Sequence, residues 1–160
     1  MAICNPGELK SLIGKGRRLI GLDVGTKTVG MALSDSTLLV ATPLVTLRRT
    51  RFRDDAARIL AEVDRHGAGG IVIGLPLALD GRDSPRTQGV RQFARNLLAC
   101  RDLPLAFWDE RLSTAAVERA MIEADLSRRR RAQLIDRAAA AYILQGCLDR
   151  IGRGEIHADC

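Results

Sequence analysis

The sequence predicts an α/β domain with a mixed sheet, in which an antiparallel meander precedes parallel strands and helices flank the sheet faces. Two observations support this prediction: short apolar runs joined by tight turns at the start, and a later alternation of helical spacing with apolar strands. The 160 residues suffice for one compact domain. Because 46% of the residues are hydrophobic and only 3% are aromatic, the core is expected to be aliphatic.

Three strands are expected first. Residues 18–24 (RLIGLDV) and 29–34 (VGMALS) flank a tight turn, which predicts an antiparallel hairpin. Residues 38–47 predict a third strand, interrupted by Pro43. Together these strands form the meander at the start of the sheet.

Helices then alternate with strands. Apolar residues recur at helical spacing over residues 52–66, and Gly67, Gly69 and Gly70 are expected to end this helix. The remaining elements expected are a central parallel strand, a helix, a short buried strand and two final helices, at residues 71–75, 88–99, 103–108, 115–125 and 128–150.

The domain is expected to span residues 18–151, with residues 1–17 as an N-terminal extension of unassigned role and 152–160 as a tail. No run approaches the roughly 20 apolar residues of a membrane span, and the start has no apolar signal-peptide core. A cytoplasmic protein without membrane contact is therefore expected.

Four scattered cysteines and two histidines make a zinc site unexpected, and Cys100 and Cys147 are interpreted as small core residues.

The chain is basic, with a formal net charge of +6. Lys10, Lys15 and Lys27 are its only lysines, so arginine supplies nearly all of the positive charge. Arginine binds phosphate through a planar fork of donors, which favours a polyanionic partner. A coding bias that fills surfaces with arginine would give the same composition.

Candidate catalytic carboxylates follow two of the strands. Asp23 ends an apolar strand, just before a turn with Lys27 at its tip. A carboxylate at such a position needs a cation or backbone amides as partners. The structural alternative is that Asp23 caps the hairpin by accepting backbone amides. Asp109, Glu110 and Arg111 follow the strand at 103–108, at the kind of strand end where ligands gather. Neighbouring carboxylates on a strand point in opposite directions, so one of the two is expected to face a site. A solvated strand end paired with Arg111 is the alternative.

The last helix supplies a third carboxylate and a basic run. Asp136 shares a helix face with small apolar residues, namely Ala132, Ala139, Ala140, Ile143 and Cys147, so it is expected on the packed side, as a functional acid or as the partner of a core arginine. Arg128, Arg129, Arg130 and Arg131 stand at the start of this helix, against its dipole, and a nucleic acid backbone would offset that conflict. A solvated face is the alternative. The loop acids Asp80 and Asp83 are interpreted as turn formers.

Asp23, Glu110 and Asp136 come from three distant elements, and nothing in the spacing proves that they meet. A cluster of carboxylates would bind Mg²⁺ or Mn²⁺. Two such ions about 4 Å apart serve in-line phosphoryl displacement. Neither a Ser-His-Asp nor a Cys-His arrangement is indicated by the two histidines.

Four motifs occur in order: residues 20–35 (IGLDVGTKTVGMALSD), 73–81 (IGLPLALDG), 109–114 (DERLST) and 135–145 (IDRAAAAYILQ). Together they resemble the YqgF family of Holliday junction resolvase-like proteins, which are also implicated in pre-16S rRNA processing. The resemblance covers residues 18–151, and each motif alone is modest.

This resemblance implies an RNase H-like fold, with acidic positions at Asp23, Glu110 and Asp136 and with Asp109 as a fourth acid. It also implies a bacterial cytosolic role in the maturation of small-subunit ribosomal RNA, which allows contact with pre-ribosomal particles. A resolvase role follows from fold similarity alone, and a fold does not fix the substrate.

The resulting hypothesis is a metal-dependent endonuclease that acts on structured RNA. Lys27, Arg111 and the run from Arg128 to Arg131 would contact phosphates. Three alternatives stay open: a resolvase acting on branched DNA, a non-catalytic RNA-binding assembly factor, and a nucleotide-binding domain. The last is suggested by the Asp-x-Gly-Thr turn, which is similar to the phosphate loop of actin-like ATPases and sugar kinases.

Overall fold

A five-stranded sheet forms the centre of the computed structural model, which describes residues 3–78, 80–109 and 128–154, the last range with side chains from 138 to 152. Its strands are β1 (Arg18–Val24), β2 (Thr28–Ser34), β3 (Ala41–Arg48), β4 (Ala68–Leu75) and β5 (Leu105–Asp109), in the order β3-β2-β1-β4-β5. β1 and β3 run antiparallel to β2, whereas β4 pairs in parallel with both β1 and β5. The predicted mixed sheet is confirmed.

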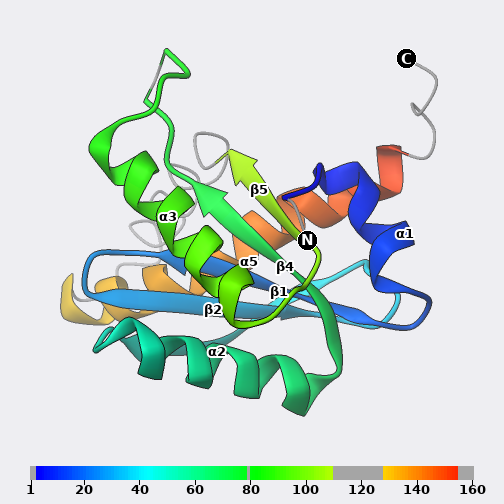
Figure 1. The fold of residues 1–160 in the computed structure, drawn as a ribbon, viewed down its shortest axis with the longest axis horizontal. Coiled ribbons are helices and arrows are strands. Elements are labelled where there is room, and N and C mark those ends of the chain that lie inside the picture. The colour runs from blue at the N-terminus through cyan, green and yellow to red at the C-terminus, as the bar shows by residue number, and fades with distance from the viewer. Residues whose placement is uncertain (1–2, 79, 110–127, 155–160) are drawn as a thin grey trace.

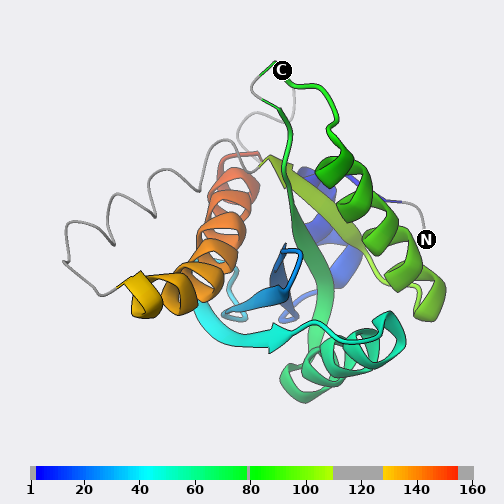
Figure 2. The same ribbon diagram turned by 90° about the vertical axis from the view of Figure 1, so that its left-hand side faces the viewer.

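The helices lie on both faces of this sheet. They are η1 (Pro6–Glu8), α1 (Leu9–Ile13), α2 (Phe52–His66), α3 (Pro85–Cys100) and α5 (Arg128–Gly154). α5 covers one face, and α2 and α3 cover the other (Figure 2). The helix predicted at residues 115–125 lies outside the described residues. No helix in the described part of the chain has the length and apolarity needed to cross a membrane.

The two faces have different cores. The α2/α3 face packs branched aliphatic side chains with Phe93, which meets Phe52 edge to face at 5.2 Å between ring centroids. The α5 face packs Leu144 and other helix residues against small residues of the sheet. A Cβ added at Gly21 would lie 2.8 Å from the Cβ of Leu144, and one at Gly146 would lie 2.9 Å from the Trp108 ring. Glycine at both positions therefore lets α5 approach the sheet closely.

Two predicted element boundaries are corrected. The third strand begins at Ala41 instead of residue 38, because Leu38 has a φ of 59° and the Asp35 carboxylate accepts the backbone N–H groups of the next two residues. Gly67 ends α2, but Gly69 and Gly70 belong to β4, where Ile13 packs against them.

Cys100, predicted to lie in the core, is exposed, because α3 ends there at the surface. Cys147 is buried on the α5 face, as predicted, and burial raises the pKa of its thiol to about 12. The two cysteines therefore differ in environment although their sequence contexts look alike.

The described part of the N-terminal segment packs against the sheet and α5. Leu9 and Ile13 are buried among residues of the α5 face. The backbone N–H of Cys4 donates to the Leu105 carbonyl at 2.9 Å, which forms a bridge beside β5. Residues 4–13 are thus part of the same packed unit as the sheet.

Candidate functional site

Asp23 lies near the carboxyl end of β1, half-buried, on the α5 face. Alternation along the strand fixes this orientation, since Ile20, Leu22 and Val24 belong to the α2/α3 core whereas a Cβ at Gly21 would meet α5. The chain then turns back into β2, where the backbone N–H of Gly25 donates to the Thr28 carbonyl at 2.8 Å. Asp23 thus lies near the end of the central strand, where the first hairpin closes.

Arg49 fastens this turn from the neighbouring strand. Its Nη1 donates to the Gly25 carbonyl at 2.7 Å, and its backbone N–H donates to the Lys27 carbonyl at 2.8 Å. The guanidinium also lies over the Phe93 ring, 5.4 Å from its centroid. The turn that follows Asp23 is therefore fixed by one arginine that links the hairpin, the end of β3 and α3.

Asp55 orders the connection between β3 and α2. Its side chain is only 2% exposed and accepts hydrogen bonds from the Thr50 backbone and hydroxyl and from Arg58, at 2.6–3.2 Å. Burial alone would raise the pKa of this carboxyl, but the hydrogen bonds from Thr50 and Arg58 outweigh it and hold the pKa below its ordinary value. Asp55 is therefore an ionised anchor inside an arginine-rich segment.

Asp109 ends β5 on the opposite face from Asp23 by strand alternation. Trp108 packs against Gly146 of α5, whereas Phe107 lies under the Arg91 guanidinium of α3, 5.5 Å from its centroid. Asp109 is two residues after Phe107 and therefore lies on the same face of the sheet, the one that α3 covers. Glu110 and Arg111 lie outside the described residues.

The backbone of α5 places position 136 one turn before Ala140. Ala140 and Leu144 contact β1 at Gly21, and Ile143 and Cys147 are buried on the same stripe. The helix begins at Arg128, and the side chains of the basic run and of Asp136 lie outside the described residues. In Figure 1 the start of α5 lies at the same end of the molecule as the β1–β2 turn.

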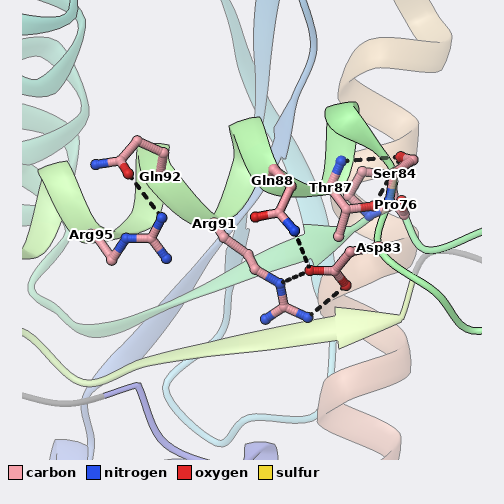
Figure 3. Close-up of polar contacts among 8 residues, drawn as sticks. All are labelled: Pro76, Asp83, Ser84, Thr87, Gln88, Arg91, Gln92 and Arg95. Atoms are coloured by element: carbon pink, nitrogen blue, oxygen red, sulfur yellow. Dashed lines mark hydrogen bonds and ion pairs between the residues drawn. The ribbon is translucent and has the colours of Figure 1, made fainter.

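The loop between β4 and α3 is held by a cap at the start of α3. Ser84 and Thr87 bond reciprocally, and the Thr87 hydroxyl also donates to the Pro76 carbonyl (Figure 3). Asp83 accepts two hydrogen bonds from Arg91, at 2.8 and 3.1 Å. Asp80 accepts the backbone N–H of Arg82, as expected of a turn former, whereas Asp83 binds side chains of α3 instead of turn backbone.

The described residues contain no group of three or more metal-ligating side chains. Of the predicted acids, Asp23 and Asp109 are described with their side chains, on opposite faces. Asp23 presents a carboxylate on the α5 face, and carboxylate oxygens are the ligands that Mg²⁺ and Mn²⁺ prefer. The donor chemistry of this residue fits such an ion.

Sequence reasoning missed Arg49 and Asp55. Arg49 contacts Gly25, 24 positions earlier, and Phe93, 44 positions later. No local sequence pattern reveals contacts between residues so far apart in the chain. For Asp55 a weak signal existed, because an aspartate near the start of a helix often accepts backbone amides.

Residues 17–150 match the RuvX family, described as Holliday junction resolvase. A relative from Paramagnetospirillum magneticum, named "Putative pre-16S rRNA nuclease", is 56% identical over 93% of this chain and 96% of its own length. A relative of the same name from Rhodospirillum rubrum is 52% identical over 96% of both chains.

Solved structures show the same fold at low sequence identity. RuvC of Thermus thermophilus in complex with a Holliday junction superposes with a TM-score of 0.52 and 15% identity, over 85% of this chain and 96% of that one. RuvC of the same organism in a second structure gives a TM-score of 0.50 at 13% identity, over 84% and 96% of the two chains. The predicted RNase H-like fold is confirmed. With a family match over most of its length and relatives above 50% identity, this chain belongs to the RuvX family of nucleases.

Proposed function

We propose that this chain is a metal-dependent endonuclease that cleaves phosphodiester bonds in precursor 16S ribosomal RNA. The observation that supports this most directly is the position of Asp23, near the carboxyl end of β1, on the face of the sheet that α5 covers. The names of the two relatives favour pre-16S rRNA as the substrate. Such a substrate would place the protein in the cytoplasm, in contact with pre-ribosomal particles.

Asp23, Asp136 and Glu110 are the residues we propose as metal ligands and catalytic carboxylates. We prefer Glu110 to Asp109, because Asp109 has the strand parity of Phe107, which faces α3. A bound Mg²⁺ or Mn²⁺ would supply activation of the attacking water and charge stabilisation of the leaving oxygen. Lys27, Arg111 and the run from Arg128 to Arg131 would hold the RNA phosphates beside these acids.

Cleavage of a precursor 16S rRNA fragment tests this proposal. Wild-type protein is incubated with Mg²⁺, Mn²⁺ or chelator, next to Asp23→Asn, Asp136→Asn and Glu110→Gln variants. We expect cutting only with metal, and a loss of at least about 100-fold in each variant, the scale seen when one electrostatic contributor to a transition state is removed.

Two controls accompany the variants. Asp80→Asn removes an equal charge from the exposed β4–α3 loop and should leave cleavage unchanged. Asp109→Asn distinguishes the role of Asp109 from that of Glu110, and it should reduce cleavage far less than Glu110→Gln does. RNA that is bound but never cut under any metal would contradict the proposal and favour an assembly factor.

A resolvase acting on branched DNA is the second candidate, and the description of the RuvX family favours it. A four-way DNA junction is therefore assayed under the same conditions. Symmetric, metal-dependent cutting of the junction, with no cutting of the RNA fragment, would replace the first proposal with this one.

A further inference from the structure

Four exposed basic side chains gather where the first hairpin meets the start of α2. Lys27 lies in the β1–β2 turn, Arg48 ends β3, and Arg51 and Arg53 lie at the beginning of α2. We call these four residues the basic junction. None of them has a carboxylate partner among the described residues, whereas Arg58, Arg91 and Arg101 each form an ion pair. The charge of the basic junction is therefore available to a ligand.

The basic junction is held in place by bonds that do not use its own guanidinium groups. Arg49 ties the hairpin to β3 through the Gly25 and Lys27 carbonyls. Arg58 donates to the Arg48 carbonyl at 2.7 Å and to the buried Asp55 at 2.6 Å. The interior bonds thus fix the backbone while the four outer side chains stay in solvent.

The positive end of the α2 dipole lies at the basic junction. Arg51 is the N-cap residue of α2 and makes no side-chain cap, so the positive end of the helix dipole adds to the charge of the arginines. Asp54 and Asp55 are the acids of the first turn, and Asp55 is buried against Arg58. A polyanion lying across the basic junction would remove this repulsion.

The basic junction lies beside the end of β1 that bears Asp23. Gly25, two residues after Asp23, is the residue to which Arg49 is bonded. In Figure 1 the β1–β2 turn and the start of α2 lie together at the left, and this end faces the viewer in Figure 2. A backbone held by the basic junction would therefore continue toward the proposed carboxylate site.

We infer that the basic junction is a second phosphate-binding surface, which grips the sugar–phosphate backbone of the nucleic acid beside the cleavage site. This inference rests on the proposed nuclease function and adds Arg48, Arg51 and Arg53 to the residues that bind the substrate. The surface recognises phosphates and so contributes affinity and orientation without reading sequence.

The salt dependence of binding tests it, because removing one phosphate-binding side chain reduces the slope of log K against log salt by about 0.9 on duplex and about 0.7 on single strands. Binding of the precursor 16S rRNA fragment and of a four-way DNA junction is measured in chelator, so that nothing is cut. The double variant Arg51→Gln/Arg53→Gln should lower the slope by about 1.4–1.8. The wild-type cleavage assay is run in parallel.

A matched double variant, Arg65→Gln/Arg95→Gln, removes the same charge elsewhere. The Arg65 side chain is 71% exposed, lies 3.6 Å from the Glu62 carboxylate, and is about 20 Å further along α2, at about 1.5 Å per residue. Arg95 is on the later half of α3 and contacts only Gln92 among the described residues. This variant should keep the wild-type slope, and both variants should keep the wild-type Tm.

Each other outcome overturns the inference. Equal slopes for wild type and both variants, with RNA still cut, would remove the basic junction from the substrate path and leave the proposed nuclease intact. An equal decrease in both variants would show that net charge, and not this surface, sets the slope. A wild-type protein that binds neither RNA nor junction would overturn the nuclease proposal as well.

Discussion

The two faces of the sheet are packed by different means. On the α2/α3 face, bulky side chains such as Ile59 and Phe93 fill the space between helices and strands. On the α5 face, Gly21, Gly146 and a run of alanines bring the helix close to the sheet. A face built on bulk loses stability when atoms are removed, whereas a face built on close approach loses stability when atoms are added.

This difference matters for function because Asp23 lies on the closely packed face. The position of Asp23 relative to residue 136 depends on the distance between α5 and β1. Gly21, two residues before Asp23 on the same face of β1, allows this distance to be short. The α2/α3 face instead holds the anchors Arg49 and Asp55, which fix the loops around the edge. One face thus positions the candidate acids and the other positions the surrounding surface.

The largest effect is expected from Phe93→Ala on the bulky face. Phe93 is 3% exposed and contacts both Phe52 and the Arg49 guanidinium. The substitution should lower the free energy of unfolding by about 3–5 kcal/mol, measured by urea denaturation. Phe93→Leu should cost much less, and a smaller decrease in Phe93→Ala than in Phe93→Leu would contradict the importance of bulk on this face.

One substitution, glycine to alanine, should act with opposite signs in two environments: a strand packed closely against a helix, and the exposed side of a helix. Gly21→Ala places a Cβ 2.8 Å from Leu144 and 3.0 Å from the Ala140 carbonyl, and should destabilise the fold by about 1–3 kcal/mol. Gly89→Ala, on the exposed side of α3 with open space around it, should stabilise by about 0.5–1 kcal/mol. Thermal unfolding of both variants measures the contrast, and a neutral Gly21→Ala would show that α5 moves away at little cost.

The smallest loss of stability is expected from Asp55→Asn, at about 1–2 kcal/mol near neutral pH, since the Arg58 side of the contact is partly in solvent. The folded-state pKa of Asp55 lies below its ordinary value, so the ionised form stabilises the fold above about pH 4, and this stability is lost as the pH falls further. The variant should therefore lose less stability than wild type between about pH 4 and pH 2. Parallel acid titrations of the two proteins check this. Curves of equal slope would argue against Asp55 as an ionised anchor.

Much of the fold follows from local pattern. β1 and α2 have the predicted bounds because their apolar periodicity is continuous and ends at strong turn or cap signals. The prediction for Gly69 and Gly70 is wrong, since the contact with Ile13, 56 or more positions earlier, outweighs the usual tendency of glycine to end structure. The packing of residues 4–13 escapes prediction for the same reason.

The candidate site divides in the same way. The position of Asp23 at a strand end is evident from the sequence, and so is the helical stripe shared by residue 136 and Ala140. The sequence does not tell on which face of the sheet Asp109 lies. Alternation fixes the face only after one residue of β5 has been oriented, and the contact between Phe107 and Arg91 does this. Arg49 needs three-dimensional proximity, because its partners come from a different hairpin and a different helix.

The core of the α5 face is shared by the two ends of the chain. Leu9 and Ile13 pack with Leu148 and Ile151 in one cluster. Chain synthesis proceeds at roughly 5–20 residues per second, so Leu9 is made several seconds before its partners Leu148 and Ile151. The strands and helices of the α2/α3 face lie between these ends and are complete by residue 109. The face that bears Asp23 is therefore assembled after the α2/α3 face during synthesis of the chain.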